Sequence, residues 1–537
     1  MQLCSHLHKG IIVISKKTAL KSAILAATLA PAMTMASGYK INEQSASGVG
    51  NAYAGQAAMV EDASVVFYNP AGMVFLERPE FTGGFTYVSG DGKFSSGTGT
   101  DAAGNDIAAG DGTYSDGGDF LGSAFIPFMY YARPVNDKMA IGLGIFTPFG
   151  TNTDYDADFV GGGFADQTQL KSIDIQPTFA YKFSDELSVG FGIDIVYMKG
   201  LLSKYVDSIS YSAEAIQGVE GRMAAFGETR EEAQAAVAQA LGKNADSAIF
   251  NTDYAGFENH YEVSGDDWGT GWNFGLMWKP TDSTTLGFAY RSEIEFNLEG
   301  DSEFENDFYM YSAAADINGV EGANGIIPAG AASGGTDATI RKQASKVPLT
   351  TPQSATFSVA HQLTNNLMLQ GGATWTGWSS FKHFDVIATE NTSGLGDGHT
   401  DISDISELNG LEDGYIGHIV EEWNDVWAAA LGASYQATPQ VLLRAGYAYD
   451  QSPVTYKYRT ARVPSSDRQW LTAGIQYKID QDWTVDMGAA YLFMKEMELE
   501  EVNKGLDDEP IATNPTSVEG KYKINAFGLA FQVSYKM

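Results

Sequence analysis

The segment AFGLAFQVSYK, residues 526–536, alternates strictly between large apolar residues and small or polar ones. Its large apolar set consists of Phe527, Leu529, Phe531, Val533 and Tyr535. Residues 470–477 and 483–493 repeat the pattern. A period of two residues is typical of a β-strand with one apolar face, whether in a soluble sandwich or in a membrane barrel that turns this face to lipid.

Composition narrows the class of protein. The chain has 537 residues, of which 19% are charged and 12% aromatic, and no apolar run approaches the roughly 18 residues that a spanning helix needs. These observations exclude an α-helical membrane protein. The balance of 33 basic against 67 acidic residues gives a net charge of -34 and argues against nucleic acid as a partner, because phosphate binding depends on Lys and Arg.

The first 36 residues resemble an export signal. They contain four lysines downstream of residue 8 and no acidic residue, and the apolar stretch Ser22–Met33 is followed by small residues that end at Ala36. This order predicts a secretory signal cleaved after Ala36, although a short amphipathic core helix is an alternative. The only cysteine, Cys4, lies in this segment, so the mature chain is predicted to lack disulfides and cysteine ligands.

Connection lengths separate a barrel from a sandwich. We identify fourteen candidate strands, at about 79–88, 122–133, 138–148, 168–183, 186–204, 262–279, 284–298, 348–363, 366–385, 424–437, 440–451, 468–479, 482–501 and 519–536. Connections of two or three residues alternate with long ones, such as 205–261 and 386–423. Short turns at one rim and long loops at the other are typical of Gram-negative outer-membrane barrels. The sequence therefore predicts an all-β fold, a fourteen-stranded antiparallel transmembrane barrel formed by residues 79–537.

Two segments need a separate interpretation. Residues 37–78 are rich in Gly, Ala, Ser and Asn, so they form either a plug inside the lumen or a disordered tail. Within the 205–261 loop, Thr229 and Glu232 have the spacing of a capping box, which predicts a surface helix at about 230–241.

Several motifs resemble those of one known family. The hatch-like stretch comprises Gly38-Tyr39-Lys40-Ile41-Asn42-Glu43, Gly48-Val49-Gly50, Ala52-Tyr53-Ala54-Gly55, Asp62-Ala63 and Asn69-Pro70-Ala71. Further motifs follow in the same order at 265–273, 290–293, 376–379, 450–453 and 464–468. The chain resembles, over essentially its whole mature length, the FadL-type outer-membrane transporters of long-chain fatty acids and other hydrophobic compounds. The resemblance implies an N-terminal hatch at 37–78 that plugs the lumen. It also implies capture of substrate by extracellular loops and lateral release beside a kinked third strand.

The resemblance also points to gating residues. The kinked strand corresponds to residues 142–150, where Pro148, Phe149 and Gly150 would form the lateral opening, because Pro cannot donate to a strand ladder. Alternatively, Pro148 only ends the strand. Asn69, Pro70 and Ala71 match the hatch motif and read as a rigid turn, which we expect to hold the plug against the wall near the kink.

Substrate contacts are expected at Lys204 and Tyr39. Lys204 aligns with a basic residue that the family uses for the substrate carboxylate, although a solvated strand end is the plainer interpretation. We expect Arg291 to pair with lumen carboxylates such as Glu293 or Glu295. His418 is a weaker head-group candidate.

Catalytic and metal motifs are missing from the sequence. The histidines show no H-E-x-x-H pattern and no paired zinc spacing, and there is no G-x-S-x-G or nucleotide-binding loop. We therefore expect no enzyme activity, no cofactor and no metal site. Loose divalent binding at acidic loops, bridging to lipopolysaccharide, is an alternative to a plain solvated surface.

The sequence predicts a monomeric barrel that passes long-chain fatty acids or similar hydrophobic molecules without energy input. The alternatives are a structural or adhesive barrel and a porin for polar solutes. The last strand ends in Met537, where barrels usually present an aromatic residue to the barrel assembly machinery, and Tyr535, Val533 and Phe531 keep the rest of that pattern.

Overall fold

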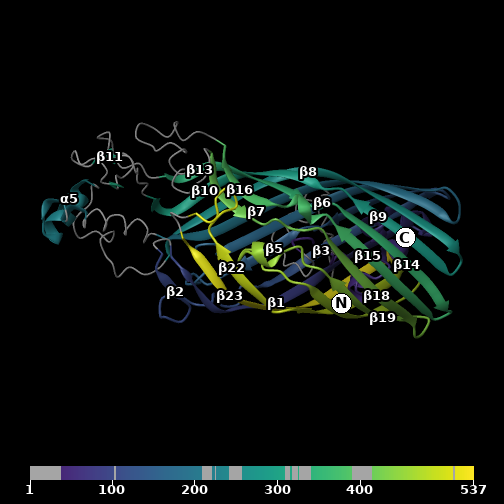
Figure 1. Ribbon diagram of the computed structural model, residues 1–537. Helices are drawn as coiled ribbons and strands as arrows, with labels where there is room; N and C mark the ends of the chain where they lie inside the picture. Colours follow the sequence, from purple (N-terminus) through teal and green to yellow (C-terminus); the bar gives the residue numbers. More distant parts are fainter. Residues whose placement is uncertain are drawn as a thin grey trace, which may run out of the picture.

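In the computed structural model a single large antiparallel sheet closes on itself as a barrel (Figure 1). The structure describes residues 38–101, 104–207, 221–223, 225–240, 257–308, 315–316, 324–325, 340–389, 414–511 and 515–537. The predicted signal at 1–36 lies outside these residues. No helix among them is long and apolar enough to cross a membrane.

The elements have the following bounds. The strands are β1 Glu80–Thr100, β2 Asp106–Ala108, β3 Ser123–Asn136, β4 Met139–Phe146, β5 Gly150–Asp154, β6 Gln167–Lys182, β7 Leu187–Asp207, β8 Phe257–Thr281, β9 Thr284–Arg291, β10 Ile294–Phe308, β11 Ala315–Asp316, β12 Asn324–Gly325, β13 Ile340–Thr351, β14 Ser354–Thr364, β15 Leu367–Thr376, β16 His383–Ala388, β17 Tyr415–Val420, β18 Val426–Gln436, β19 Val441–Asp450, β20 Arg468–Lys478, β21 Trp483–Met494, β22 Met497–Val502 and β23 Ser517–Lys536. The helices are α2 Ala46–Gly50, α3 Val65–Tyr68 and α5 Arg230–Ala240, with short 3-10 turns η1 Gln56–Ala58, η2 Pro70–Phe75, η5 Trp378–Ser380 and η7 Tyr456–Tyr458.

The ring contains fourteen strands, as the sequence predicts. Its neighbours run β1, β3, β4, β6, β7, β8, β9, β14, β15, β18, β19, β20, β21 and β23. Pairing of β23 with β1, from Glu80 opposite Lys536 to Thr100 opposite Ser517, closes the ring. Strands β5, β10, β13, β16, β17 and β22 continue ring strands toward the end of the barrel that carries α5 (Figure 1).

Alternation of side chains decides which face meets lipid. On β23 the large residues Phe527 and Leu529 are 41% and 52% exposed, whereas Ala526 and Gln532 are buried toward the lumen. Outer-membrane barrels carry an outward apolar band of this kind, because lipid offers no hydrogen bonds to polar side chains.

The N-terminal segment, residues 38–78, packs against the inner faces of strands on opposite sides of the ring. Helix α2 contacts β20, β21 and β23, while η1 contacts β9 and β14, and η2 contacts β6, β7 and β8. Ionic and amide contacts hold it: Arg444 binds Glu61 at 3.1 Å, and Gln532 donates to Asp62 at 2.8 Å. The segment therefore occupies the lumen and does not extend as a tail.

Glycines in the wall allow the N-terminal segment to approach closely. A Cβ built at Gly287 on β9 would lie 1.9 Å from the carbonyl oxygen of Ala57, which is closer than any real contact. At Gly371 on β15 the nearest atom to such a Cβ is 3.4 Å away, in Leu431.

Gly287→Val is therefore expected to displace the N-terminal segment and open the lumen to polar solutes. The physical reason is that backbone atoms of the segment cannot yield as a flexible side chain would. The measurement is the sensitivity of expressing cells to a large hydrophilic antibiotic that the intact outer membrane excludes. Gly371→Val, which meets only ordinary contacts, is the matched control. Equal antibiotic sensitivity of the two variants would show that the position of the N-terminal segment does not depend on its close contact with Gly287.

Helix α5 begins where the capping box predicts. Thr229 N donates to Glu232 Oε2 at 3.0 Å, and Glu232 N donates to Thr229 Oγ1 at 3.3 Å. This reciprocal pairing satisfies two backbone donors of the first turn.

Candidate functional site

The third ring strand is interrupted. Strand β4 ends at Phe146, opposite Asp174 of β6, and β5 begins at Gly150, opposite Lys171. Three residues, 147–149, thus face two residues of the continuous strand β6, which is the count of a β-bulge. The hydroxyl of Ser172 donates to the carbonyl oxygen of Phe149 at 2.6 Å and accepts from its amide at 2.9 Å. Pro148, Phe149 and Gly150 therefore lie at a break in the strand, which resumes beyond them.

The break leaves one side of β5 without a neighbouring ring strand. Strand β3 pairs with β4 only from Phe128 to Asn136, and the ladder of β5 is with β6 alone among the residues described. The N-terminal segment fills this position. Ile41 N donates to Pro148 O at 2.8 Å, and Gly150 N donates to Tyr39 O at 2.9 Å. Residues 39–41 thus form an isolated antiparallel bridge with residues 148–150 that covers the break.

The tripeptide Asn69-Pro70-Ala71 lies elsewhere on the wall. The Asn69 amide donates to Leu276 O of β8 at 3.0 Å, and Ser188 of β7 donates to Ala71 O at 2.9 Å. The hydrogen bonds of this turn to the wall therefore go to β7 and β8, and its expected place near the kink stays a prediction. The residues bonded to the break come from the start of the segment.

Tyr39 is enclosed by aromatic rings. Ring centroids of Trp378, Phe381, Trp423 and Phe149 lie 4.7, 5.5, 5.8 and 6.1 Å from that of Tyr39. The side chain is 2% exposed, and its hydroxyl donates to Thr350 O at 3.3 Å. Edge-to-face pairs of this kind each contribute about 0.5–1.5 kcal/mol beyond burial of area. The cage holds the start of the N-terminal segment in place beside the break.

An apolar pocket adjoins Tyr39. Most of its lining is hydrophobic: Tyr39, Leu170, Leu201, Leu202, Val263, Leu298, Val347, Phe384 and Val463. We call it the apolar pocket. It suits a hydrocarbon chain, because each buried methylene group contributes roughly 0.8 kcal/mol.

A second cavity shares Leu202 and Val263 with the apolar pocket. We call it the outer pocket. Its lining contains five cationic side chains and two carboxylates: Lys204, Lys457, Arg459, Arg462 and Lys504 against Glu500 and Glu501. In a chain of net charge -34 this local excess of cations is unusual.

Lys204 lies in the outer pocket, as a head-group ligand would. Its ammonium group makes no hydrogen bond or ion pair with any residue that the structure describes. Arg462 is held more tightly, because it donates to Ser203 O at 3.1 Å. His418 also lines the outer pocket, but its Nδ1 is bonded to Asp385 at 2.6 Å and is therefore not free for a substrate.

A buried carboxyl group lies next to these pockets. Glu421 accepts hydrogen bonds from Trp423 Nε1 at 2.7 Å and from Thr460 Oγ1 at 3.0 Å. Burial raises the pKa of Glu421 to about 8, since removal from water disfavours the charged form. The carboxyl group is therefore largely neutral near pH 7 and opposes a bound anion only weakly.

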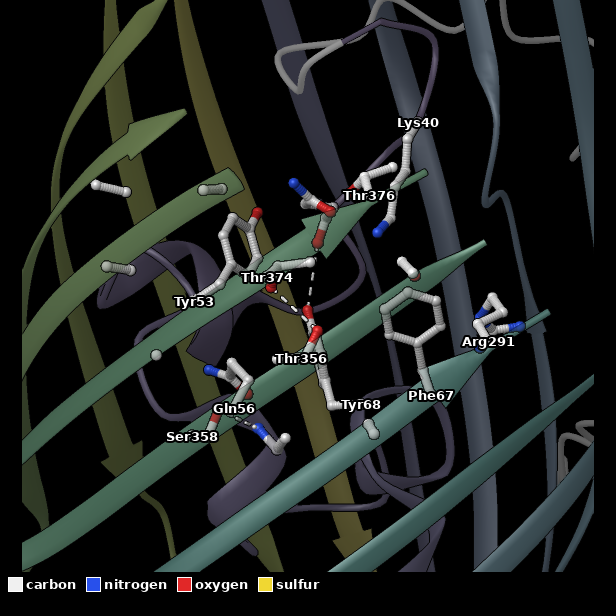
Figure 2. Close-up of a pocket in the computed structure, with 18 of the residues that line it drawn as sticks. Lys40, Tyr53, Gln56, Phe67, Tyr68, Arg291, Thr356, Ser358, Thr374 and Thr376 are labelled. Carbon is white, nitrogen blue, oxygen red and sulfur yellow. Dashed lines mark hydrogen bonds between the residues drawn. The ribbon is translucent and has the colours of Figure 1, made fainter. Parts of the chain in front are cut away.

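A third cavity lies in the lumen (Figure 2). Trp378 is among the residues that line it. Lys40 and Arg291 enter it from different elements, Lys40 from the N-terminal segment and Arg291 from β9. The ammonium group of Lys40 makes no hydrogen bond or ion pair within the described ranges. Sequence reasoning missed Lys40 as a cation inside the barrel, although it lies in the quoted hatch motif.

Arg291 does pair with lumen carboxylates, but not with those expected. It forms ion pairs with Asp194 and, at 3.3 Å, with Asp174. Glu293 and Glu295 are exposed. The strand breaks between β9 and β10 just after Arg291, so sequence neighbours on that side do not share its face. The partners come instead from β6 and β7, which lie in the same part of the wall and are separated from β9 by β8.

Comparison with known proteins agrees with this geometry. The model of the family described as outer membrane protein transport protein (OMPP1/FadL/TodX) matches residues 27–537. Outer membrane protein P1 of Haemophilus influenzae is 29% identical, over 94% of this chain and 98% of its own length. The long-chain fatty acid transport protein of Escherichia coli strain K12 is 26% identical, over 97% of this chain and 100% of its own.

Solved structures share the fold. A FadL homologue from Pseudomonas aeruginosa has a TM-score of 0.70 at 23% identity, covering 93% of this chain and 99% of its own. The toluene transporter TodX of Pseudomonas putida has a TM-score of 0.54 at 16% identity, covering 91% and 99%. With a closed fourteen-stranded ring, a lumen-filling N-terminal segment and a family match along residues 27–537, the chain belongs to the OMPP1/FadL/TodX family of outer-membrane transport proteins.

Proposed function

We propose that this protein carries long-chain fatty acids, or amphiphiles like them, passively across the outer membrane. The observation that carries the proposal is the contact between the cation-rich outer pocket and the apolar pocket, which share Leu202 and Val263. An anionic head group and a hydrocarbon tail fit this pair of cavities together. Charge-assisted hydrogen bonds to the head group strengthen where water is excluded. Relatives are named for fatty acids or for toluene, and the cations favour the acid here.

Passage beyond the apolar pocket requires movement of Tyr39. A tail that displaces this ring from its cage also pulls on the two backbone bonds that cover the break, from Ile41 to Pro148 and from Tyr39 to Gly150. Release would then be sideways, between β3 and β5, into the lipid. Asn69, Pro70 and Ala71 act as the fixed anchor of the hatch, since their bonds are to β7 and β8 and survive this movement.

The proposal also covers the surroundings of the protein in the membrane. We propose a monomer that sits among outer-membrane lipid and lipopolysaccharide and is inserted by the barrel assembly machinery. A porin for polar solutes fits less well, because the N-terminal segment is bonded to the wall at Arg444 and Gln532. A purely adhesive barrel would have no use for an apolar cavity beside a break in its wall.

Uptake measurements in cells that lack their own transporter test the proposal. Cells expressing the chain are expected to take up radiolabelled oleate well above the empty-vector level, while uptake of a neutral alkane or of a polar oligosaccharide rises much less. Fractionation of the outer membrane confirms expression, and heat-modifiable mobility on gels confirms that the barrel is folded. Preferential uptake of the alkane would replace the fatty acid by a hydrocarbon, and preferential uptake of the oligosaccharide would support a porin. If none of the three is taken up, the transport proposal fails.

A further inference from the structure

Three side chains from distant segments meet at the extracellular rim. His383 comes from β16, His418 from β17, and Asp508 from the turn between β22 and β23. Nε2 of His418 lies 3.5 Å from Asp508 Oδ1, and Nε2 of His383 lies 3.7 Å from the same oxygen. All three ligand atoms lie within 4.8 Å of one another.

These three atoms are buried and have no hydrogen-bond partner among the residues that the structure describes. His383 Nε2, His418 Nε2 and Asp508 Oδ1 are each shielded from water and unsatisfied. A buried polar group left without a hydrogen bond costs about 1–3 kcal/mol, and one cation bound between the three atoms would satisfy all of them. Their chemistry, two imidazole nitrogens and a carboxylate oxygen, is that of a cation site.

A neighbouring carboxylate orients the more buried ring. Asp385 Oδ1 lies 2.6 Å from His418 Nδ1, and the His418 side chain is 2% exposed. If Nδ1 carries the proton and donates it to Asp385, the lone pair of Nε2 points toward Asp508. Histidines that ligate metals almost always have an outer carboxylate or carbonyl of this kind. Glu422 Oε1 lies 3.8 Å from His383 Nε2 but is not part of the group of three ligand atoms.

We propose that His383, His418 and Asp508 bind a divalent transition-metal cation of the zinc class. Bonds of about 2.0–2.1 Å in a tetrahedral zinc site place neighbouring ligand atoms about 3.3 Å apart. The two histidine–aspartate separations of 3.5 and 3.7 Å need only a small contraction to reach this geometry, and the two histidine nitrogens lie within 4.8 Å of each other. Imidazole with carboxylate favours zinc-like ions over calcium and magnesium, which prefer oxygen ligands. The sequence shows no zinc spacing, because the ligands lie on three segments that only the fold brings together.

The cation would join two parts of the outer pocket. His418 lines this pocket on one side, and Asn503 and Lys504, just before Asp508, line it on another. Binding would tie the β16–β17 hairpin to the 503–510 turn and hold that wall in one position. The proposed metal site does not depend on the proposed transport of fatty acids. Only the effect of the metal on substrate binding in the outer pocket rests on that proposed function.

Metal titration of the full mature barrel tests the proposal. The tag-free protein in detergent is stripped with EDTA and titrated with zinc by calorimetry, in millimolar calcium and magnesium that occupy carboxylate-only sites. We expect one tightly bound zinc per chain, and a cobalt-loaded form with the visible absorption bands of tetrahedral coordination.

Variants locate the bound ion. His418→Gln and Asp508→Asn should abolish the stoichiometric binding, and Asp385→Asn should weaken it by about 10- to 100-fold, as loss of an outer-shell partner does elsewhere. His361→Gln is the matched control, since His361 is bonded to Thr284 at the other end of the barrel. Heat-modifiable mobility shows that each variant is folded. Absence of stoichiometric binding in the unaltered chain, or equal binding in folded His418→Gln, would overturn the proposal and leave an ion-pair cluster only.

Discussion

Oxidation of a chain that carries Lys40→Cys and Phe149→Cys is expected to reduce oleate uptake by more than about tenfold, because binding energy cannot displace a covalent bond. Reduction should restore it. Lys40 and Phe149 face each other as an antiparallel bridge, flanked by the Ile41–Pro148 and Tyr39–Gly150 hydrogen bonds. Such non-hydrogen-bonded pairs have Cα atoms about 4.5 Å apart, within the range that disulfides span.

Natural cysteines do not complicate this experiment. The only natural cysteine, Cys4, lies in the predicted signal, so the mature variant would contain just the two introduced thiols. Uptake is measured on the same cells before and after a reductant, with the two single variants treated alike. This design separates the effect of the disulfide on uptake from any loss of uptake caused by removing the Lys40 charge. If the oxidised chain, with its disulfide verified by mass spectrometry, transports as fast as the reduced one, the N-terminal segment does not open the break.

Lys204→Gln is expected to lower oleate uptake at limiting concentration by about tenfold, since a hydrogen bond to a charged group contributes about 1.5–3 kcal/mol and other cations in the pocket offset part of the loss. Uptake at saturating oleate should change less, because the change weakens capture and leaves the path beyond it intact. A neutral alcohol of equal chain length should be unaffected. The measurement is initial uptake rate against oleate concentration.

Lys199→Gln supplies the matched control for this prediction. Lys199 lies five residues earlier on β7, on the opposite face of the strand, and is exposed. The Lys199→Gln substitution changes the net charge by the same amount as Lys204→Gln and does not alter the lining of the outer pocket. Equal loss in the two variants would mean that only overall charge matters. Equal loss of oleate and alcohol in Lys204→Gln would show that the residue supports the pocket wall and does not bind the head group.

The architecture was readable from the sequence because its signals are local. Alternation at Phe527, Leu529 and Phe531 reports which face meets lipid, and two- or three-residue turns such as 184–185 fix antiparallel neighbours without knowledge of the rest of the chain. For Pro148 the local signal left two interpretations open, a kink that the family resemblance implies and a strand end, because Pro removes a ladder donor in both cases. The Thr229–Glu232 capping box located helix α5, because its signal is local.

What the sequence could not supply are contacts between segments far apart in the chain. Arg291 pairs with Asp174 on β6 and Asp194 on β7, which lie three and two strands away from β9 along the wall. The hydrogen bond from Asn69 to Leu276 of β8 depends on how the N-terminal segment enters the lumen. The outer pocket and the cluster around His418 draw on loops separated by up to hundreds of residues. Periodicity and turn chemistry act over a few residues, whereas these sites depend on which loops face one another across the rim. Barrel closure decides that, and no local pattern encodes it.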